Sequence, residues 1–227
     1  MQPDEPQGAA SSKALIDEHR ERYARAPMLP AKDDVELRSL VDAAGRHVEI
    51  EVGPGRGGFM LERLAARADV AMIGFEVKRK WVTLVNERLE RQGVGARGKV
   101  FADDAGLALP RLVPNGSIGA LYLHFPDPWW KKRHEKRLVM RAQFLDQVAR
   151  LLRPGGEFFV QTDVEERAER YEMQIAAHPA FEPLGDGEAP RSPRLADNPY
   201  QARSHRERRA IADRIPVYRL RFSKKAR

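Results

Sequence analysis

The feature that most constrains the fold is a glycine-rich segment between a predicted strand and a predicted helix. Residues 47–52 have the pattern of a strand, residues 53–58 read Gly-Pro-Gly-Arg-Gly-Gly, and residues 59–67 have the pattern of a helix. Glycine lets a backbone approach a ligand closely, and the helix that follows offers free amide groups at its positive end. The order of strand, glycine turn and helix therefore predicts an α/β fold with a ligand site at this turn.

The rest of the chain continues the alternation of strands and helices. A helix is expected over residues 34–45, before the first strand, and another begins near Glu135. The final segment, residues 217–222, alternates as a strand with one buried face. Further strands are expected over 70–77, 99–101, 118–125 and 157–162, with helices over 81–92, 135–152 and 164–177. This alternation is typical of a parallel sheet.

The length of 227 residues favours one domain with terminal extensions. Residues 1–30 are rich in Pro, Ala, Ser and charge and are predicted to form a flexible arm, and residues 31–227 a single domain with a basic C-terminal segment. Residues 183–203 carry six Gly and Pro residues and are predicted to form a long loop.

Composition excludes several classes of site. The chain has no cysteine, which excludes disulfides, cysteine-ligated metals and thiol nucleophiles. No apolar run approaches the roughly 18 residues of a membrane-spanning helix, and the first residues lack the apolar core of a secretory signal. We expect a cytoplasmic protein with no membrane contact and no metal.

The positive charge is concentrated in two stretches. The chain carries 40 Lys and Arg against 33 Asp and Glu. Residues 131–141 hold six basic residues and one acid, and residues 191–227 hold twelve and three, so the remainder is acidic. Clustered basic residues favour contact with a polyanion such as a nucleic acid, the alternative being arginine-rich solubilising tails.

Three acids lie at or just after the ends of successive strands and indicate the ligand. Glu51 stands two residues before the first glycine, where a carboxylate suits an amino-acid ammonium. Glu76 ends the second strand, where an acid can accept hydrogen bonds from ribose hydroxyls. Asp104 follows the third strand, a common place to meet an adenine amino group. Together with the glycines Gly53 and Gly55, these acids predict S-adenosyl-L-methionine as cofactor.

Other interpretations of the same residues remain open. Gly53, Gly55 and Gly58 also satisfy the GxGxxG fingerprint of NAD-binding enzymes. Glu51 as a cap or salt-bridged acid, and Glu76 paired with a nearby lysine, would be ordinary structural roles.

An aspartate flanked by two prolines follows the fourth strand. Asp127 stands between Pro126 and Pro128, and two tryptophans and the basic run 131–137 follow it. The prolines fix the backbone, and the tryptophans and cations offer stacking surface and phosphate contacts. A turn aspartate beside a solvated helix face is the structural alternative.

At this point the sequence resembles the tRNA (guanine-N7)-methyltransferase family. The resemblance covers about residues 45–222 and rests on Glu51-Val52-Gly53-Pro54-Gly55, Gly74-Phe75-Glu76-Val77, Phe125-Pro126-Asp127-Pro128-Trp129 with its basic continuation, and Thr162-Asp163. It implies a Rossmann-like class I methyltransferase fold: a mostly parallel seven-stranded sheet with an antiparallel C-terminal strand and helices on both faces. It also implies methyl transfer to a guanine of tRNA, in the variable loop. We expect a monomer or a homodimer.

The resemblance also implies roles for individual residues. Asp127 would be catalytic or position the guanine, and would lie beside the cofactor together with Glu51, Gly53, Gly55, Glu76 and Asp104. Substrate contacts would come from Lys131, Arg133, His134, Lys136, Arg137, Asp163, Ser204, His205, Arg206 and Glu207. One departure concerns the last four residues, where the family has threonine, any residue, an aromatic residue and glutamate. Here Arg206 replaces the aromatic ring.

Three functions are compatible with these residues. The first is a tRNA guanine-N7 methyltransferase that uses S-adenosyl-L-methionine. The second is a related methyltransferase with another RNA or a small-molecule acceptor, which the altered segment 204–207 supports. The third is a non-catalytic RNA-binding relative, and retention of Glu51, Glu76, Asp127 and Asp163 speaks against it. An NAD enzyme explains neither Asp127 nor the tryptophans.

Overall fold

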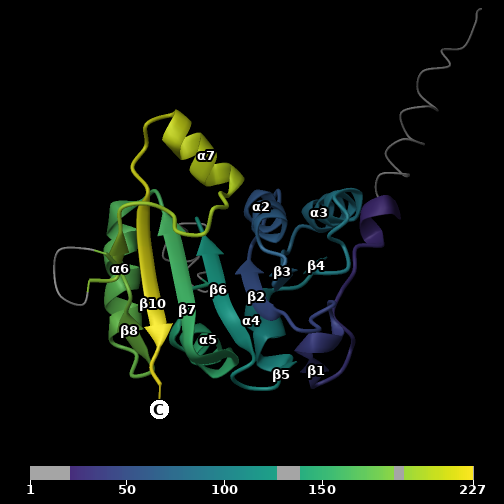
Figure 1. Ribbon diagram of the computed structural model, residues 1–227, viewed down its shortest axis with the longest axis horizontal. Coiled ribbons are helices and arrows are strands. Elements are labelled where there is room, and N and C mark those ends of the chain that lie inside the picture. Colours follow the sequence, from purple (N-terminus) through teal and green to yellow (C-terminus); the bar gives the residue numbers. More distant parts are fainter. Residues whose placement is uncertain (1–20, 127–138, 187–191, 227) are drawn as a thin grey trace, which may run out of the picture.

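The computed structural model describes residues 21–126, 139–186 and 192–226, and its centre is a mixed sheet. The main strands follow the order β4-β3-β2-β6-β7-β10-β8, with β9 paired to β10 (Figure 1). Their bounds are β2 His47–Val52, β3 Val70–Phe75, β4 Gly98–Phe101, β6 Ile118–His124, β7 Leu152–Thr162, β8 Phe181–Pro183, β9 Arg194–Leu195 and β10 Tyr218–Lys224. The predicted sheet with an antiparallel C-terminal strand is confirmed, since β10 runs antiparallel to β7 and β8.

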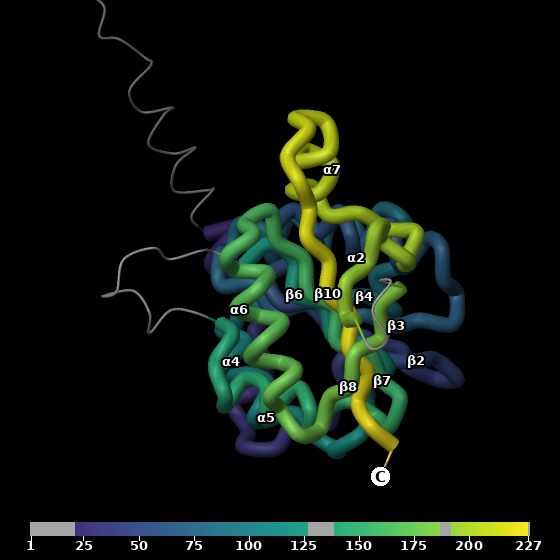
Figure 2. The backbone as a smooth tube through the Cα atoms, turned by 90° about the vertical axis from the view of Figure 1, so that its left-hand side faces the viewer, coloured from purple at the N-terminus to yellow at the C-terminus, as the bar shows by residue number. Residues whose placement is uncertain are grey.

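Helices cover both faces of the sheet (Figure 2). The helices α2 (Gly58–Ala66) and α3 (Arg79–Arg91) pack on one face over a core that contains Phe59, Val85 and Tyr122. The helices α4 (Ala105–Ala108), α5 (Ala142–Leu151) and α6 (Glu165–Ala176) belong to the other face, whose core contains Ile50 and Phe158. We call these the α2/α3 face and the α5/α6 face. A further helix, α7 (His205–Ala212), lies beyond the end of the sheet (Figure 1).

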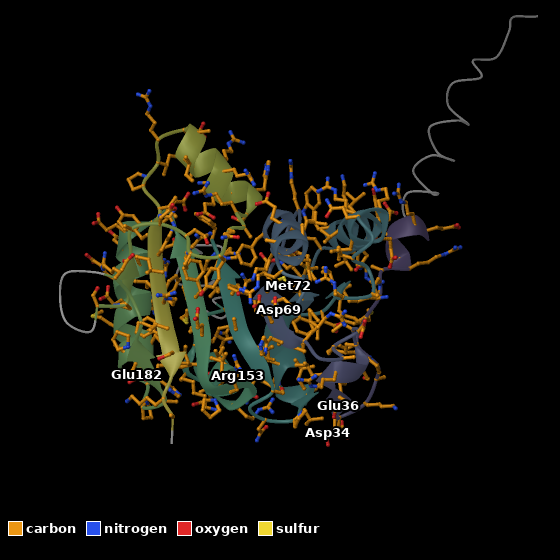
Figure 3. All side chains as sticks on the ribbon, in the orientation of Figure 1. Asp34, Glu36, Asp69, Met72, Arg153 and Glu182 are labelled. Atoms are coloured by element: carbon orange, nitrogen blue, oxygen red, sulfur yellow. The ribbon has the colours of Figure 1, made fainter. Side chains whose placement is uncertain are left out.

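Alternation along β2 explains which side chains reach each face. Val48, Ile50 and Val52 belong to the core of the α5/α6 face. Successive side chains of a strand point to opposite faces, so Glu49 and Glu51 lie on the α2/α3 face. The parallel strands run towards the end of the sheet that carries α7, and β10 runs away from it (Figure 1). Charged side chains such as Asp34, Glu36, Arg153 and Glu182 lie at the opposite end (Figure 3).

Two helix predictions are wrong in detail. Residues 34–45 hold β1 (Val35–Glu36), which pairs with β5 (Leu112–Val113), and the short 3-10 helix η1 (Leu37–Ser39). Val35 and Leu37 are both buried in the core, and tertiary packing outweighs a weak helical pattern. A second 3-10 helix, η2 (Leu109–Arg111), leads into β5.

The helix expected from Glu135 begins only at Ala142, because Arg141 has extended backbone angles and is its N-cap. Val139 and Met140 pack against the core from the segment before the helix. The part of that prediction that concerns residues 135–138 lies outside the described residues.

Part of the predicted N-terminal arm packs on the domain. The Arg22 guanidinium pairs with Glu87 of α3, and Ala26 and Leu29 are buried. The Ala102 amide donates a hydrogen bond to the carbonyl of Pro27. Within the described ranges, no helix is both long and apolar enough to cross a bilayer.

Candidate functional site

A pocket of about 900 Å³ lies at the carboxyl ends of β2, β3, β4 and β6. Four residues that the sequence predicts to hold a cofactor line it: Gly53, Gly55, Glu76 and Asp104. Parallel strands that end together at the centre of a doubly wound sheet form the crevice where such folds bind ligands. The structure thus brings residues from three separate loops to one pocket.

The glycine turn has a backbone that other residues adopt only with strain. Gly53, Gly55 and Gly57 all have positive φ, at 68°, 54° and 72°. The Gly53 amide donates a hydrogen bond of 2.9 Å to the carbonyl of Phe75, which ties the turn to β3. At Gly57 an added Cβ would lie 2.6 Å from a methyl of Val85, so α2 and α3 pack closely only because this residue has no side chain.

Glu76 links the glycine turn to the start of α3. Its Oε2 atom accepts a hydrogen bond of 3.1 Å from the Gly55 amide, and its Oε1 atom accepts one of 2.8 Å from the Lys78 amide. A carboxylate offers about four acceptor positions, so both oxygens keep one for a ligand hydroxyl. The local ion pair considered for Glu76 is replaced by these backbone contacts.

Asp104 is the N-cap of α4 and borders the pocket from the side of β4. Its Oδ1 atom accepts a hydrogen bond of 2.7 Å from the Gly106 amide, and the residue is exposed. The preceding Asp103 also lines the pocket, and its Oδ2 atom accepts a hydrogen bond of 2.8 Å from the Leu29 amide. The N-terminal segment is thereby attached next to the pocket, which sequence patterns did not indicate.

Glu51 lies behind the pocket wall, on the α2/α3 face, and is not among the lining residues. Its side chain is 1% exposed, and its Oε1 atom is 2.9 Å from Nδ1 of His124 at the end of β6. Its Oε2 atom has no hydrogen-bond partner among the described residues. A buried carboxylate oxygen without a partner costs free energy unless a ligand or water satisfies it.

Phe125, next to His124, has a strained backbone at the pocket. Its φ is 47°, a left-handed value that is uncommon for an aromatic residue, and its amide donates a hydrogen bond of 2.8 Å to the carbonyl of Gln161. Strain of this kind clusters at functional sites. Phe125 and Pro126 line the pocket, as do Val139 and Arg141. The predicted residues Asp127, Lys131, Arg133, His134, Lys136 and Arg137 lie outside the described residues.

Asp163 and Arg206 form an ion pair at the end of the sheet that carries α7. Asp163 follows β7, and Arg206 lies in the first turn of α7, where the resembled family has an aromatic residue. His205 and Arg206 are exposed. Two residues that were predicted to contact the substrate, Asp163 and Arg206, thus bind each other. Neither residue 163 nor any of residues 204–207 lines the pocket itself.

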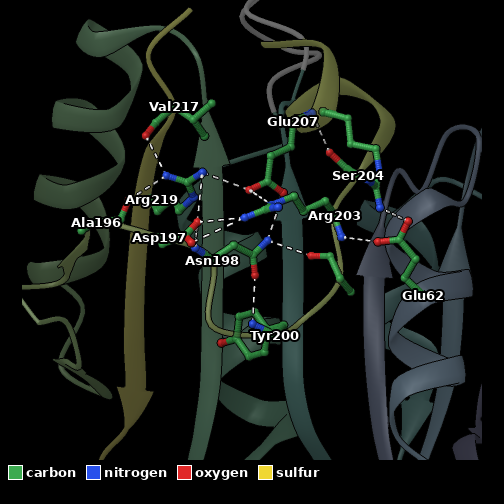
Figure 4. Close-up of polar contacts among 12 residues, drawn as sticks. Glu62, Ala196, Asp197, Asn198, Tyr200, Arg203, Ser204, Glu207, Val217 and Arg219 are labelled. Carbon is green, nitrogen blue, oxygen red and sulfur yellow. Dashed lines mark hydrogen bonds and ion pairs between the residues drawn. The ribbon is translucent and has the colours of Figure 1, made fainter. Parts of the chain in front are cut away.

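Ser204 and Glu207 hold α7 in place (Figure 4). The Ser204 hydroxyl accepts a hydrogen bond of 3.1 Å from the Glu207 amide, as an N-cap does. The Glu207 carboxylate is fully buried and accepts hydrogen bonds of 3.0 Å from both Arg219 of β10 and Asn198. Both residues lie below the exposed surface of α7.

A second buried polar group lies next to Glu51. The Arg63 guanidinium donates two hydrogen bonds to Glu49, and the Tyr122 hydroxyl donates a third of 2.9 Å. Burial lowers the pKa of Arg63, but the hydrogen bonds to Glu49 and the electrostatic attraction of Glu49 and the nearby tyrosines together outweigh burial, so the pKa lies above the ordinary value. Burial, together with the charge of Glu49, raises the pKa of Tyr122 well above the ordinary range. This group fixes α2 to the sheet.

Sequence reasoning gave no role to His124 or Gln161, nor to Phe125, although Phe125 stands in a segment that carries the family resemblance. His124 stands at the end of an apolar strand, and a polar residue in such a position is the one signal that could have indicated it. Gln161 lies opposite His124 on β7, with both side-chain amide atoms unpaired in the described structure. The strain at Phe125 is visible only in the folded backbone.

Comparison with known proteins shows to which family the chain belongs. A family model described as "Putative methyltransferase" matches residues 45–220, which is most of the chain. The chain belongs to this methyltransferase family. A curated tRNA (guanine-N(7)-)-methyltransferase of Myxococcus xanthus is 34% identical over 182 residues, which cover 79% of this chain and 84% of that protein. One of the same name from Anaeromyxobacter dehalogenans is 36% identical over 82% of this chain and 90% of that protein.

The fold of this methyltransferase is also found among solved structures. A SAM-dependent O-methyltransferase from Thermotoga maritima superposes with a TM-score of 0.51 at 19% identity, over 94% of this chain and 72% of that one. At this identity the likeness concerns the fold alone.

Proposed function

We propose that this methyltransferase transfers a methyl group from S-adenosyl-L-methionine to N7 of a guanine in tRNA. The observation that carries the proposal is the pocket in which the glycine turn, Glu76 and Asp104 come together beside Phe125 and Pro126. The relatives from Myxococcus and Anaeromyxobacter, named for this reaction, support it. We further propose the variable loop as the site of methylation and the cytoplasm as the location.

The residues around the pocket fit the parts of this cofactor. Glu76 retains acceptor positions for ribose hydroxyls, and Asp104 offers a carboxylate for the base. One oxygen of Glu51 has no partner among the described residues and suits the ammonium group. The cofactor supplies a methyl group on a sulfonium: the lone pair of guanine N7 forms the new bond to carbon while sulfur keeps the electrons of the old one. Guanine N7 carries no proton, so the protein mainly has to align the two groups.

The decisive experiment combines the purified protein with labelled S-adenosyl-L-methionine and bulk tRNA that lacks N7-methylguanosine. We expect label in tRNA and aniline-induced cleavage at one guanine of the variable loop. Label at another position or in another acceptor would favour a related methyltransferase. Cofactor binding without any transfer would favour a non-catalytic RNA-binding protein.

Asp127 is proposed as the catalytic residue of the reaction. Positive charge moves from sulfur to the purine during transfer, and a carboxylate beside the base stabilises it and orients the base. Replacement Asp127→Ala is expected to lower turnover by about 100-fold or more, in the range seen when one transition-state contact is lost. Binding of S-adenosylhomocysteine, measured by calorimetry, should stay close to that of the wild type. Wild-type turnover in this variant would remove Asp127 from the mechanism.

Lys131, Arg133 and Arg137 are proposed to contact tRNA phosphates, together with His134 and Lys136. Each phosphate contact releases counterions, so removal of a contact flattens the dependence of affinity on salt. The triple change to Ala should weaken tRNA binding and reduce the slope of log K against log salt by about one unit for each contacting residue. The matched control is Arg153→Ala, an exposed arginine at the opposite end of the sheet (Figure 3). Equal slopes for both variants would exclude the cluster from the interface.

A further inference from the structure

Three buried polar side chains lie on the α2/α3 face at the ends of adjacent strands: Glu51 of β2, His124 of β6 and Gln161 of β7. The side chains of Glu51 and His124 are 1% and 2% exposed, and Gln161 is fully buried. In the described part of the chain, Glu51 Oε2, His124 Nε2 and both amide atoms of Gln161 have no hydrogen-bond partner. Such an accumulation is rare in a folded core and points to a polar ligand.

The contact between Glu51 and His124 defines the roles of their atoms. The distance from His124 Nδ1 to Glu51 Oε1 is 2.9 Å. A carboxylate oxygen only accepts hydrogen bonds, so Nδ1 carries the proton and donates. One oxygen of Glu51 is thus held by the histidine, and the other has no donor among the described residues.

The imidazole ring itself is held by aromatic neighbours. The Phe59 ring of α2 meets it edge to face with centroids 4.4 Å apart, Tyr122 stacks at 5.8 Å, and Phe159 meets it edge to face at 5.9 Å. A ring enclosed on three sides has little rotational freedom, so the direction of its Nδ1 hydrogen is fixed. The hydrogen bond along that direction holds Oε1 of Glu51 in place.

Glu51 adjoins residues that line the proposed cofactor pocket, both along the chain and through its contact with His124. Val52 and Gly53, the two residues that follow Glu51, line that pocket, and so does His124. The cofactor carries an α-ammonium group at the end of its methionine part, which is a strong donor of the kind that a buried carboxylate oxygen requires.

We infer that His124 is a positioning residue, which holds Oε1 of Glu51 so that Oε2 receives the ammonium group of the cofactor. The inference rests on the proposed function for the identity of the cofactor. It assigns no direct contact with the reacting atoms to His124. The structural alternative is that His124 only supplies a hydrogen bond to the buried Glu51 carboxylate. The two roles predict different effects of a His124 replacement on the affinity for ligands with and without an ammonium group.

The test compares two ligands that differ in the ammonium group alone. They are S-adenosylhomocysteine and its analogue in which hydrogen replaces that group, each titrated into the full chain by calorimetry. The wild type is expected to prefer S-adenosylhomocysteine. In His124→Phe this preference should fall about tenfold, in line with the loss of one well-aligned hydrogen bond to a charged group, while affinity for the analogue stays unchanged. His124→Asn, which keeps a donor, should retain most of the preference.

The control variant is Gln174→Leu on α6, because Gln174 also has an unpaired buried amide oxygen and does not line the pocket. It should behave as the wild type. A measurement on the unaltered protein covers the case in which His124→Phe does not fold. The NMR signal of the His124 Nδ1 hydrogen should shift with S-adenosylhomocysteine and not with the analogue.

The possible results separate the inference from the proposed function. An unchanged preference in a folded His124→Phe, equal weakening of both ligands, or an NMR shift that is the same for both would overturn the role of His124 and leave the methyltransferase intact. Absence of any S-adenosylhomocysteine binding to the wild type would overturn the cofactor assignment, and the inference with it.

Discussion

At the scale of single residues, Gly57 has the most restrictive surroundings of the glycine turn. It combines a φ of 72° with a contact in which an added Cβ would lie 2.6 Å from Val85. Gly93, after α3, has a similar φ of 69° and no atom within 4 Å of such a Cβ. The two glycines therefore separate the cost of the backbone conformation from the cost of the close approach between helices.

Replacement of each glycine by alanine measures these two costs. Gly93→Ala should lower the free energy of unfolding by about 1 kcal/mol through the left-handed backbone alone. Gly57→Ala should lower it by about 2–4 kcal/mol, because overpacking against Val85 adds to the same strain. Urea denaturation of both variants gives the comparison. Equal losses of unfolding free energy in the two variants would mean that α2 and α3 can move apart to accommodate the added methyl group without a loss of stability.

At the scale of elements, α7 is attached to the domain through its buried side. Glu207 pairs with Arg219 of β10, the Arg203 amide donates a hydrogen bond of 2.9 Å to Glu62 of α2, and Gly58 packs against the backbone of residues 203–205 (Figure 4). The helix thus connects the C-terminal strand to the helix after the glycine turn. Two exposed arginines of α7 add ion pairs to these contacts, Arg208 with Glu62 and Arg206 with Asp163.

Loss of the Glu207 carboxylate should therefore release α7. Glu207→Ala leaves the Arg219 guanidinium buried without its main partner, which costs about 3–5 kcal/mol in comparable cases. Asp213→Asn removes the partner of Arg209 in an exposed pair and should cost below about 1 kcal/mol. Unfolding free energies and hydrogen exchange of residues 205–212 report both effects. Unaltered protection of α7 in Glu207→Ala would show that other contacts hold the helix.

Helices, strands and turns could be predicted from the sequence where residues close together in the chain determine them. The glycine turn, the strands on either side of it and α6 follow from periodicity and punctuation within about ten residues. The β1–β5 pairing, the burial of Glu207 and the contact between His124 and Glu51 join residues 73 or more positions apart, or depend on a neighbouring strand. No pattern along the chain states which strand lies beside which, so these parts of the site required the fold.

At the scale of the whole molecule, the stability of the core under α2 depends on Tyr122 and Tyr200 remaining un-ionised. Burial is the main reason that the pKa values of Tyr122 and Tyr200 lie well above 10.0, with the charges of Glu49 and Glu157 adding to it. In the unfolded chain both hydroxyls ionise near their ordinary pKa. Above that pH the folded protein binds more protons than the unfolded chain, so its stability falls as pH rises.

The expected outcome is a loss of unfolding free energy from pH 10 upwards, with a slope of about 1.4 kcal/mol per pH unit for each buried tyrosine. Tyr122→Phe should remove the contribution of one tyrosine from that slope. Below pH 9, its plot of unfolding free energy against pH should run parallel to that of the wild type. Tyr23→Phe, outside this buried group, is the matched control. Urea midpoints between pH 8 and 11 provide the measurement, and identical slopes in all three proteins would contradict it.

The place of β10 in the sheet has a consequence for biosynthesis. This strand comes after every other strand in the chain, yet it lies between β7 and β8 and carries Arg219, the partner of Glu207. While a ribosome is still making residues 218–224, β8, β9 and α7 have been synthesised but lack the strand against which they pack. The half of the sheet that holds the glycine turn has all its strands by then. The nascent chain can therefore complete its cofactor side first, and the side that carries α7 closes last.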